Sequence, residues 1–363
     1  MYNNIATFIF SALLTLISFF ACTTTKSTAQ ESNQIPTNPI KETAISNTYR
    51  FAFYNVENLM DTLDNPITAD DEFTPQGANK WTAQRYDIKL KHLAKVIAAM
   101  DCPAVLGLTE IENAQVVKDL LGQKTISKGN YGFVHYDSPD RRGIDVAFAY
   151  NKELVKIIES EKIGINFPEG VTKEAETTRD ILHVKATIGA NPIHFFVNHW
   201  SSRRGGAEGS EPKRFYVASV LRKSIDAIQK LDANAKIVVL GDFNDEPSDK
   251  SVVEILKASA PVTEPYTDRL YDLMAPFQAD KKGSYYYKGQ WDMIDNIVVS
   301  GSVLSSKGSV FCQNATIFKD NFMLYTDKSG VANPSRTYGG THYFGGYSDH
   351  LPVFVEAVIK DLP

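Results

Sequence analysis

An apolar run followed at once by a cluster of acidic and amide side chains constrains this fold more than any other part of the sequence. Residues Ile237 to Leu240 are all apolar and mostly β-branched, a pattern typical of a strand buried on both faces. The polar segment from Gly241 to Pro247 follows directly and contains Asp242, Asn244, Asp245 and Glu246. Asp242 and Asn244 lie two positions apart, so on an extended backbone they face one side, where a carboxylate and an amide suit a phosphate with a hard cation beside it. An Asx-rich turn has the same composition, so this segment alone leaves both interpretations open.

The N-terminal segment has the pattern of an export signal. Residues Ile5 to Phe20 form an apolar run of signal-peptide length that is short for a membrane span. Ala21 and Cys22 follow, and a small residue before cysteine resembles the lipobox of bacterial lipoproteins, in which the cysteine is lipidated. We therefore expect a signal peptide over residues 1–22 and a lipid anchor at Cys22, on a periplasmic or outer membrane surface. Simple secretion and a retained anchor are the alternatives, and all three export the protein.

The rest of the chain divides into a tether and one large domain. Residues 23–47 are rich in Thr, Ser, Asn, Pro and Gln and are too polar to pack, so a flexible tether is expected there. The 363-residue chain is 43% hydrophobic and 22% charged, which suits a globular catalytic domain over residues 48–363. Its net charge of −5 gives no overall positive field, so binding of a polyanion requires a local basic patch or a metal. Cys22, Cys102 and Cys312 have neither disulfide-framework nor metal-binding spacing, and whether the last two pair stays open.

Strands and helices alternate along this domain. Alternating or continuous apolar residues predict strands at 49–54, 104–110, 144–150, 182–188, 193–198, 237–240, 284–287, 294–300 and 350–358. Helical spacing predicts helices at 81–100, 114–121, 212–231 and 251–260, and an irregular loop is expected at 301–341. The order of strand, long helix, strand and polar tip occurs in both halves, which indicates two similar halves packed together.

A series of expected strand ends carries Asn, Asp, Glu or His side chains. They are Asn55 with Glu57, Glu110, His199, Asp242 with Asn244, and Asp295, and Ser348-Asp349-His350 begins the last strand. The motifs that contain them are Tyr54-Asn55-Val56-Glu57, Leu108-Thr109-Glu110, Val197-Asn198-His199, Gly241-Asp242-Phe243-Asn244, Ile294-Asp295-Asn296-Ile297 and Ser348-Asp349-His350-Leu351-Pro352. In this order they resemble the endonuclease/exonuclease/phosphatase superfamily, which includes pancreatic deoxyribonuclease. The resemblance covers roughly residues 48–360. It implies an α/β four-layer sandwich, with two mixed β-sheets packed face to face and helices on both outer faces.

The resemblance also implies a divalent metal that offsets the charge of a phosphate. Glu110 is the expected principal ligand, and Asn55, Glu57 and Asp349 are expected in or near the coordination sphere. Mg²⁺ takes oxygen ligands and keeps several waters, so one or two carboxylates from the protein suffice. Mg²⁺ is therefore the expected metal, with Mn²⁺ able to substitute.

The remaining polar residues at the strand ends are the expected catalytic groups. Asp295 is expected to orient His350 and raise its basicity. Two assignments stay open, in which either His350 or Asp242 takes the proton from the attacking water. We favour Asp242, with Asn244 beside it at the water and His350 on the phosphoryl oxygens.

His199 is expected on the opposite side of the phosphate, where it contacts the phosphate or protonates the leaving oxygen. Asp145 is its expected partner, and a structural aspartate is the alternative. Arginines in a Gly-rich loop suit the flanking phosphates of a polymer, and aromatic rings suit stacking on bases; a solvated loop and core packing are the alternatives. The expected substrate-binding residues are Arg142, Arg203, Arg204 and Trp200.

These inferences favour an exported Mg²⁺-dependent phosphodiesterase, an endonuclease that hydrolyses DNA or RNA by metal-assisted attack of water. The loop from Asn198 to Gly206 resembles the Asn-His-x-x-Ser-Lys-x-Gly run of secreted bacterial deoxyribonucleases. A phosphatase or phospholipid phosphodiesterase, of the inositol phosphate or sphingomyelin class, is the alternative with the same machinery, and a non-catalytic binding lipoprotein is a third. The expected partners are nucleic acid or another phosphodiester and, through Cys22, a membrane. The chain is expected to be a monomer.

Overall fold

The structure, a computed structural model, describes residues 46–172, 176–203 and 206–360. The predicted signal peptide, the lipid anchor at Cys22, most of the tether and Arg204 lie outside the described residues. No helix in the described part of the chain is both long enough and apolar enough to span a membrane.

Six strands from distant parts of the chain form the first large sheet. They pair in the order β14-β19-β1-β2-β4-β3. Their bounds are β1 Ser46–Leu59, β2 Val105–Ile111, β3 Tyr131–His135, β4 Asp145–Asn151, β14 Val310–Ile317 and β19 Val353–Lys360. β1 runs parallel to β2 and antiparallel to β19, so the sheet is mixed.

Seven strands form the second large sheet. Their order is β5-β6-β7-β8-β13-β10-β9. Their bounds are β5 Val155–Ile163, β6 Ile181–Ile188, β7 Asn191–His199, β8 Ile237–Asp242, β9 Ala258–Ser259, β10 Leu270–Asp272 and β13 Asp295–Ser300. β7 is parallel to β8, and β8 is antiparallel to β13, so functional groups at the ends of β7 and β8 lie beside the start of β13.

Helices and short hairpins complete the fold. The α-helices are α1 Ala83–Ala99, α2 Ala114–Leu121, α3 Ala207–Leu231 and α4 Ala275–Ala279. The short strand pairs are β11 Tyr285–Tyr287 with β12 Gln290–Asp292, β15 Leu324–Thr326 with β16 Ala332–Pro334, and β17 Tyr338–Gly339 with β18 His342–Tyr343. α2 begins where predicted because the Asn113 side chain accepts hydrogen bonds from the N–H groups of Gln115 and Val116.

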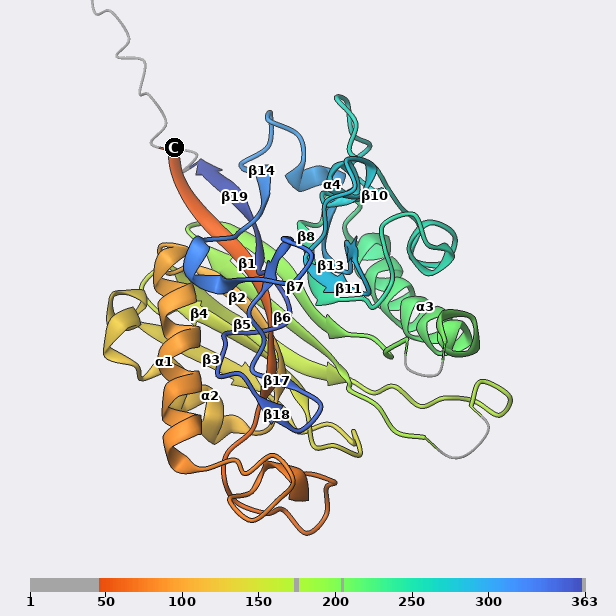
Figure 1. The fold of residues 1–363 in the computed structure, drawn as a ribbon. Coiled ribbons are helices and arrows are strands. Elements are labelled where there is room, and N and C mark those ends of the chain that lie inside the picture. The colour runs from red at the N-terminus through yellow and green to blue at the C-terminus, as the bar shows by residue number, and fades with distance from the viewer. Residues whose placement is uncertain (1–45, 173–175, 204–205, 361–363) are drawn as a thin grey trace, which may run out of the picture. The chain divides into compact units, whose positions relative to one another are not determined.

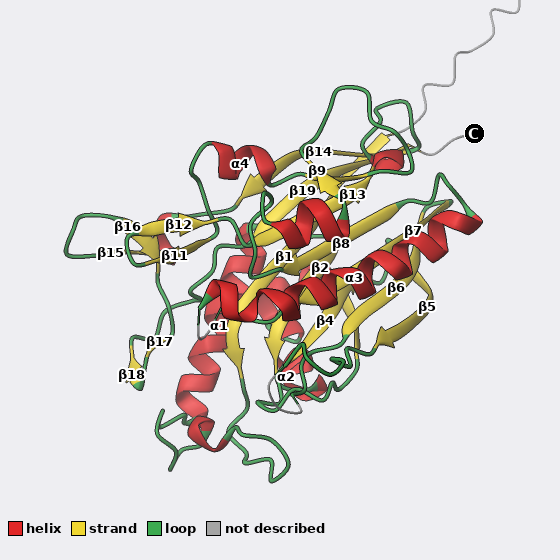
Figure 2. Ribbon diagram, turned by 90° about the vertical axis from the view of Figure 1, so that its right-hand side faces the viewer, coloured by secondary structure: helices red, strands yellow, loops and turns green. Residues whose placement is uncertain are grey.

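The alternation of side chains along β8 shows how the layers are built. Val238 and Leu240 face the first sheet and enter the core between the two sheets. Ile237 and Val239 face the other way and pack under α3. α1 and α2 cover the outer face of the first sheet in the same manner. Figures 1 and 2 show α1 and α3 on opposite sides of the strands. The predicted α/β four-layer sandwich is confirmed.

Three predicted elements differ from the structure. The expected loop at 301–341 is wrong in part, because it contains β14, whose register against β19 shifts between Gln313 and Thr316; this bulge hides the alternating pattern. The helix predicted at 251–260 is a π-helical segment, Ser251–Leu256, which ends at Lys257 with φ of 61°. α3 starts at Ala207 rather than at 212. Pro212 lies inside the helix, where it removes one backbone donor without ending the helix.

Candidate active site

Strand ends from both sheets meet at one edge of the sandwich. The register places Asn55 opposite Thr109, and His199 beside Asp242. Asp242 in turn lies opposite Asp295. The amide of Asn55 donates to Asp242 Oδ2 at 3.0 Å, and this bond joins the first sheet to the second. These predicted site residues therefore lie together.

His350 forms a buried pair with Asp295. The distance from His350 Nδ1 to Asp295 Oδ2 is 2.7 Å. Burial lowers the pKa of His350, but the carboxylates of Asp295, Asp242 and Asp349 outweigh burial and hold that pKa well above its ordinary value. These carboxylates therefore favour the cationic form of His350, and its backbone N–H donates to Ser348 Oγ at 3.1 Å.

Asp242 lies between two histidine side chains. Its Oδ2 is 3.6 Å from Nε2 of His199 and 3.9 Å from Nε2 of His350. Burial is the main cause that raises the pKa of Asp242 to about 7; His350 opposes the rise and Asp295 adds to it. Its Oδ1 accepts the backbone N–H of Asn244 at 2.9 Å, which fixes the carboxylate. A held carboxylate with a pKa near neutrality suits a general base.

His199 is buried in surroundings that favour its neutral form. Burial, with Arg179, Arg142 and His350, lowers its pKa well below the ordinary value. Its Nδ1 is buried and, within the described residues, has no hydrogen-bond partner. A neutral imidazole at this position can donate or accept one hydrogen bond through Nε2.

Asp145 does not orient His199, so the predicted Asp145–His199 pair is wrong. Asp145 instead contacts His135 of β3, whose backbone pairs with Ala147: Asp145 Oδ2 lies 3.1 Å from His135 Nε2. Its Oδ1 accepts the N–H of Ser138 at 2.9 Å and also the hydroxyl of Ser138. The alternative, a hydrogen-bonded structural aspartate, describes these contacts.

Glu110 presents a half-buried carboxylate at the end of β2. Its Oε2 accepts the N–H of Asn58 at 2.8 Å, and Oε1 lies 3.4 Å from the amide nitrogen of Asn55. Four residues here have positive φ, a conformation that costs non-glycine residues about 1 kcal/mol or more. They are Glu57, Asn58, Glu110 and Asn244, with φ from 48° to 62°.

Glu57 holds a loop that is distant in the sequence. Its Oε2 and Oε1 accept the N–H groups of Thr337 and Tyr338 at 2.6 and 3.1 Å. Burial and Asp349 raise its pKa to about 7, while Lys89 lowers it. Asp349, the other predicted ligand, makes an ion pair of 2.7 Å through Oδ2 with an arginine, Arg336.

The donor chemistry fits a hard divalent cation. Asn55, Glu110 and Asp349 offer oxygen atoms, which Mg²⁺ and similar ions prefer. The raised pKa values of Asp242 and Glu57 reflect buried negative charge that a cation would offset. Oδ1 of Asp295 is likewise buried without a partner among the residues that the structure describes.

Trp200 belongs to the core. Its ring is fully buried and stacks on Phe243 with centroids 4.1 Å apart. Its carbonyl accepts bonds from the Asn244 amide at 3.0 Å and from Arg179 Nη2 at 2.6 Å. The predicted base-stacking role of Trp200 is wrong because no ring face is open to a base, and the alternative of core packing is confirmed.

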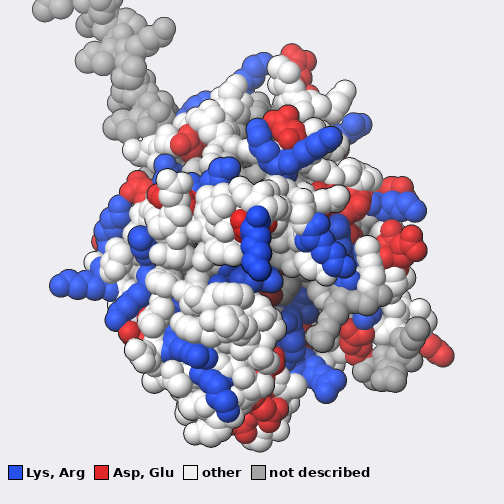
Figure 3. Space-filling view, viewed as in Figure 1, with Lys and Arg blue, Asp and Glu red and all other residues white. Residues whose placement is uncertain are grey.

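The basic residues predicted to bind substrate differ in whether their side chains are already held by other residues. Arg203 is tied down, because its Nε donates to the carbonyl of Asn244 at 2.6 Å and its Nη2 to Asp249 at 2.9 Å. Arg142 is exposed and close enough to lower the pKa of His199. Figure 3 shows Lys and Arg side chains around a hollow near the middle of the face that Figure 1 presents.

Sequence reasoning missed two buried cations. Arg179 donates to Asp140 Oδ2 at 3.0 Å, and its Nε is buried without a partner in the described segments. Lys89 donates to Thr337 Oγ1 at 2.6 Å and to the carbonyl of Tyr347 at 2.7 Å. The sequence contains a signal for each: an arginine two residues before the apolar strand β6, and a lysine on the apolar face of α1.

The sequence matches the Endonuclease/Exonuclease/phosphatase family over residues 50–359. The chain belongs to this family. No curated protein matches the chain. Family membership confirms the predicted metal-dependent phosphoesterase. The group of Asp242, Asp295 and His350, whose ligand atoms lie within 4.8 Å of one another, could hold an ion, which agrees with the divalent-metal dependence of the family.

Several solved structures share the fold at low sequence identity. An endonuclease/exonuclease/phosphatase family protein from Bacteroides thetaiotaomicron is 16% identical with a TM-score of 0.55, and the match covers 88% of this chain and all (100%) of that one. Danio rerio (D. rerio) TDP2 complexed with single-strand DNA product is 17% identical with a TM-score of 0.51, over 85% and 98%. A Bacteroides thetaiotaomicron mannosyl-6-phosphatase is 15% identical with a TM-score of 0.52, over 86% and 100%.

Proposed function

We propose that the protein is an exported, Mg²⁺-dependent phosphodiesterase that cleaves DNA or RNA internally. The observation that supports this most directly is the position of Asp242, within 4 Å of Nε2 of both His199 and His350. Such a group of one carboxylate and two imidazoles can bind a phosphate and move a proton beside it.

The three side chains take different parts in hydrolysis. Asp242 accepts the proton of the attacking water, since its pKa of about 7 lies close to neutral pH. His350 is kept cationic by Asp295 and stabilises the negative phosphoryl oxygens. His199, neutral and buried, shares a hydrogen bond with the phosphate or the leaving oxygen. When bound by Glu110, Asn55 and Asp349, Mg²⁺ supplies charge that offsets the phosphate.

A polymeric substrate is supported by cations beside this site. Arg142 is exposed, and Arg142 and Arg179 both lower the pKa of His199. Arginine contacts suit phosphates that flank the one being cleaved. TDP2, which shares the fold, is complexed with single-strand DNA product. The N-terminal sequence supports export with a lipid anchor at Cys22, and we propose a monomer.

A phosphatase with the same catalytic groups is the second candidate. It is favoured by the shared fold of a mannosyl-6-phosphatase. A small phosphomonoester has no flanking phosphates for the arginines beside the site to bind. The two candidates therefore differ in whether a small monoester or a long diester is the better substrate.

A substrate panel tests the proposal on the full chain. Plasmid, single-stranded DNA, RNA, bis-p-nitrophenyl phosphate, mannose 6-phosphate, an inositol phosphate and sphingomyelin are offered with Mg²⁺ or with EDTA. We expect Mg²⁺-dependent cleavage of a nucleic acid that nicks circular plasmid, and no cleavage in EDTA. Glu110→Gln should abolish it, whereas Glu264→Gln, at an exposed position, should not. Faster turnover of a monoester than of any nucleic acid would favour the phosphatase and reject the endonuclease.

A further inference from the structure

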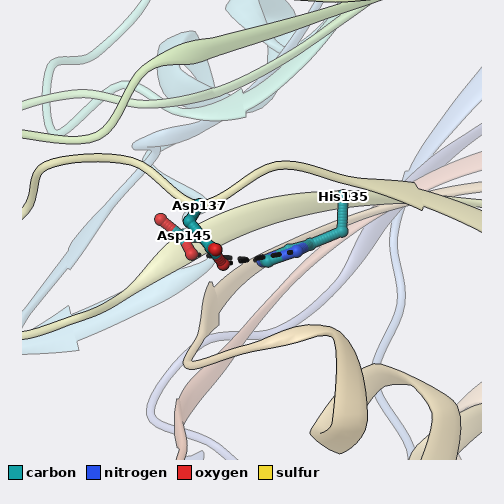
Figure 4. A group of neighbouring side chains, drawn as sticks. All are labelled: His135, Asp137 and Asp145. Atoms are coloured by element: carbon teal, nitrogen blue, oxygen red, sulfur yellow. Dashed lines mark hydrogen bonds and ion pairs between the residues drawn. The ribbon is translucent and has the colours of Figure 1, made fainter. Parts of the chain in front are cut away.

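A second group of potential metal ligands lies where the loop between β3 and β4 joins the two strands. His135 is the last residue of β3 and Asp145 is the first of β4, and Asp137 follows His135 by two positions. Figure 4 shows the two carboxylates on the same side, next to the imidazole. The side chains of His135 and Asp145 are each 4% exposed, whereas that of Asp137 is 90% exposed.

The distance between His135 and Asp145 matches that between two ligands on one ion, and Asp137 Oδ1 lies 3.9 Å from the other ring nitrogen, Nδ1. His135 Nε2 and Asp145 Oδ2 are 3.1 Å apart, and one ligand atom from each of the three side chains lies within 4.8 Å of the others. Two ligands on a tetrahedral Zn²⁺ are roughly 3.3 Å apart. Asp145 is already oriented, because Ser138 occupies its Oδ1 through both N–H and hydroxyl and leaves Oδ2 to face His135. Carboxylates that ligate metals are usually held by such outer hydrogen bonds.

We propose that His135, Asp137 and Asp145 form a transition-metal site, selective for Zn²⁺ over Mg²⁺, that closes the loop between β3 and β4. An imidazole with two carboxylates suits Zn²⁺, while Mg²⁺ prefers oxygen alone. Two carboxylates and a neutral imidazole balance the charge of one divalent ion. The exposed carboxylate of Asp137 gives the ion an entry path and leaves a position for water.

A basic side chain that contacts this loop, Lys162, is engaged elsewhere. Lys162 donates to the backbone carbonyl of Asp137 at 2.8 Å and lies 3.6 Å from Asp180 Oδ2. It therefore binds the loop through its main chain and does not neutralise the carboxylate of Asp137.

The site would fix a loop that supports the catalytic edge. Asp140, within this loop, binds the guanidinium of Arg179 at 3.0 Å and accepts the N–H of Arg142 at 2.9 Å. Both arginines are close enough to lower the pKa of His199. An ion that ties His135 to Asp145 joins the two ends of the loop, so its binding stabilises the folded state. This inference does not depend on which phosphoester is the substrate.

Zinc content of variants tests the site. The full chain is equilibrated with Zn²⁺, dialysed against Mg²⁺-containing buffer, and its zinc is measured by atomic emission. Wild type should retain one more zinc per chain than Asp137→Asn or His135→Gln. Asp64→Asn, a control at another exposed aspartate, should match wild type. Added Zn²⁺ should raise the thermal midpoint of wild type more than that of Asp137→Asn.

A protonated His135 that bridges two carboxylates is the competing arrangement, and it binds no metal. Equal zinc content in wild type and either ligand variant would overturn the site and leave the proton bridge. Asp137→Asn keeps the experiment decisive even if His135→Gln fails to fold, because an exposed carboxylate contributes little to packing.

Discussion

The contact of 2.7 Å between Asp295 and His350 predicts that Asp295 raises the pKa of His350, and this effect can be measured. Asp295→Asn removes the nearest charge that opposes burial, so the pKa of His350 should fall. Activity that needs the cation is lost as pH rises through that pKa, so the alkaline limb of the pH–rate profile should move to lower pH. We expect kcat/KM for bis-p-nitrophenyl phosphate to fall about 100-fold or more at neutral pH.

The control for this variant is Asp280→Asn. Asp280 is exposed and forms an ion pair with Lys282, so the pH–rate profile of this variant should match that of wild type. An Asp295→Asn enzyme with an unshifted alkaline limb would show that Asp295 does not set the charge of His350.

Asp272 gives a pH dependence of stability. It is buried, and burial raises its pKa to about 7. Among the described residues only one of its oxygens has a hydrogen-bond partner, the N–H of Met274 at 2.9 Å. Below about pH 4 the side chain is protonated in both the folded and unfolded chain. Between that pH and about 7 the unfolded chain ionises first, so the free energy of unfolding falls as pH rises.

Asp272→Asn removes this ionisation. The gain in unfolding free energy over wild type should be larger at pH 8 than at pH 4 by about 2–4 kcal/mol, measured by urea denaturation. Asp268→Asn, at an exposed position in the same segment, should show no such difference. A gain that is independent of pH would mean that Asp272 is not protonated in the folded protein.

At the scale of elements, Lys89 on α1 fastens the β17–β18 segment to the end of β1. It bonds Thr337 and Tyr347, while Glu57 accepts the N–H of Thr337. Lys89→Met leaves the buried Glu57 without its cation, so we expect a loss of about 2–4 kcal/mol in unfolding free energy. Lys91→Met, on the same helix but with a side chain 63% exposed, should cost much less in the same denaturation experiment. Equal stability of the two variants would exclude this fastening role.

The elements that sequence predicts best are those with an uninterrupted apolar pattern. The strand before Asp242 and helix α2 appear where expected, since one is continuously apolar and the other has an Asn113 cap. β14 was missed because its bulge breaks the alternation. Glu57 was expected near a metal, and its contacts with residues far along the chain could not be inferred from the motif around it.

At the scale of the whole molecule, sequence predicts which polar groups are functional better than how they pair. Asn55 and Asp242 are 187 residues apart and touch because the two sheets pack face to face. That packing also decides that Trp200 is buried and that Asp145 meets His135 rather than His199. Strand-end motifs carry no information on the offset between two sheets, so such pairings follow only from the folded chain.

The charge of the whole chain makes binding of a polyanion sensitive to salt. With a net charge of −5, attraction to nucleic acid must come from local cations such as Arg142 and be screened by salt. Plasmid cleavage should fall steeply with ionic strength, whereas cleavage of bis-p-nitrophenyl phosphate should change little. Arg142→Ala should weaken plasmid cleavage and reduce the slope of log rate against log salt by about 1, since one phosphate contact is lost. Lys223→Ala, at an exposed position on α3, should leave both the rate and the slope unchanged. Equal losses on plasmid and on the small diester would instead place Arg142 at the scissile phosphate, because only that contact is common to both substrates.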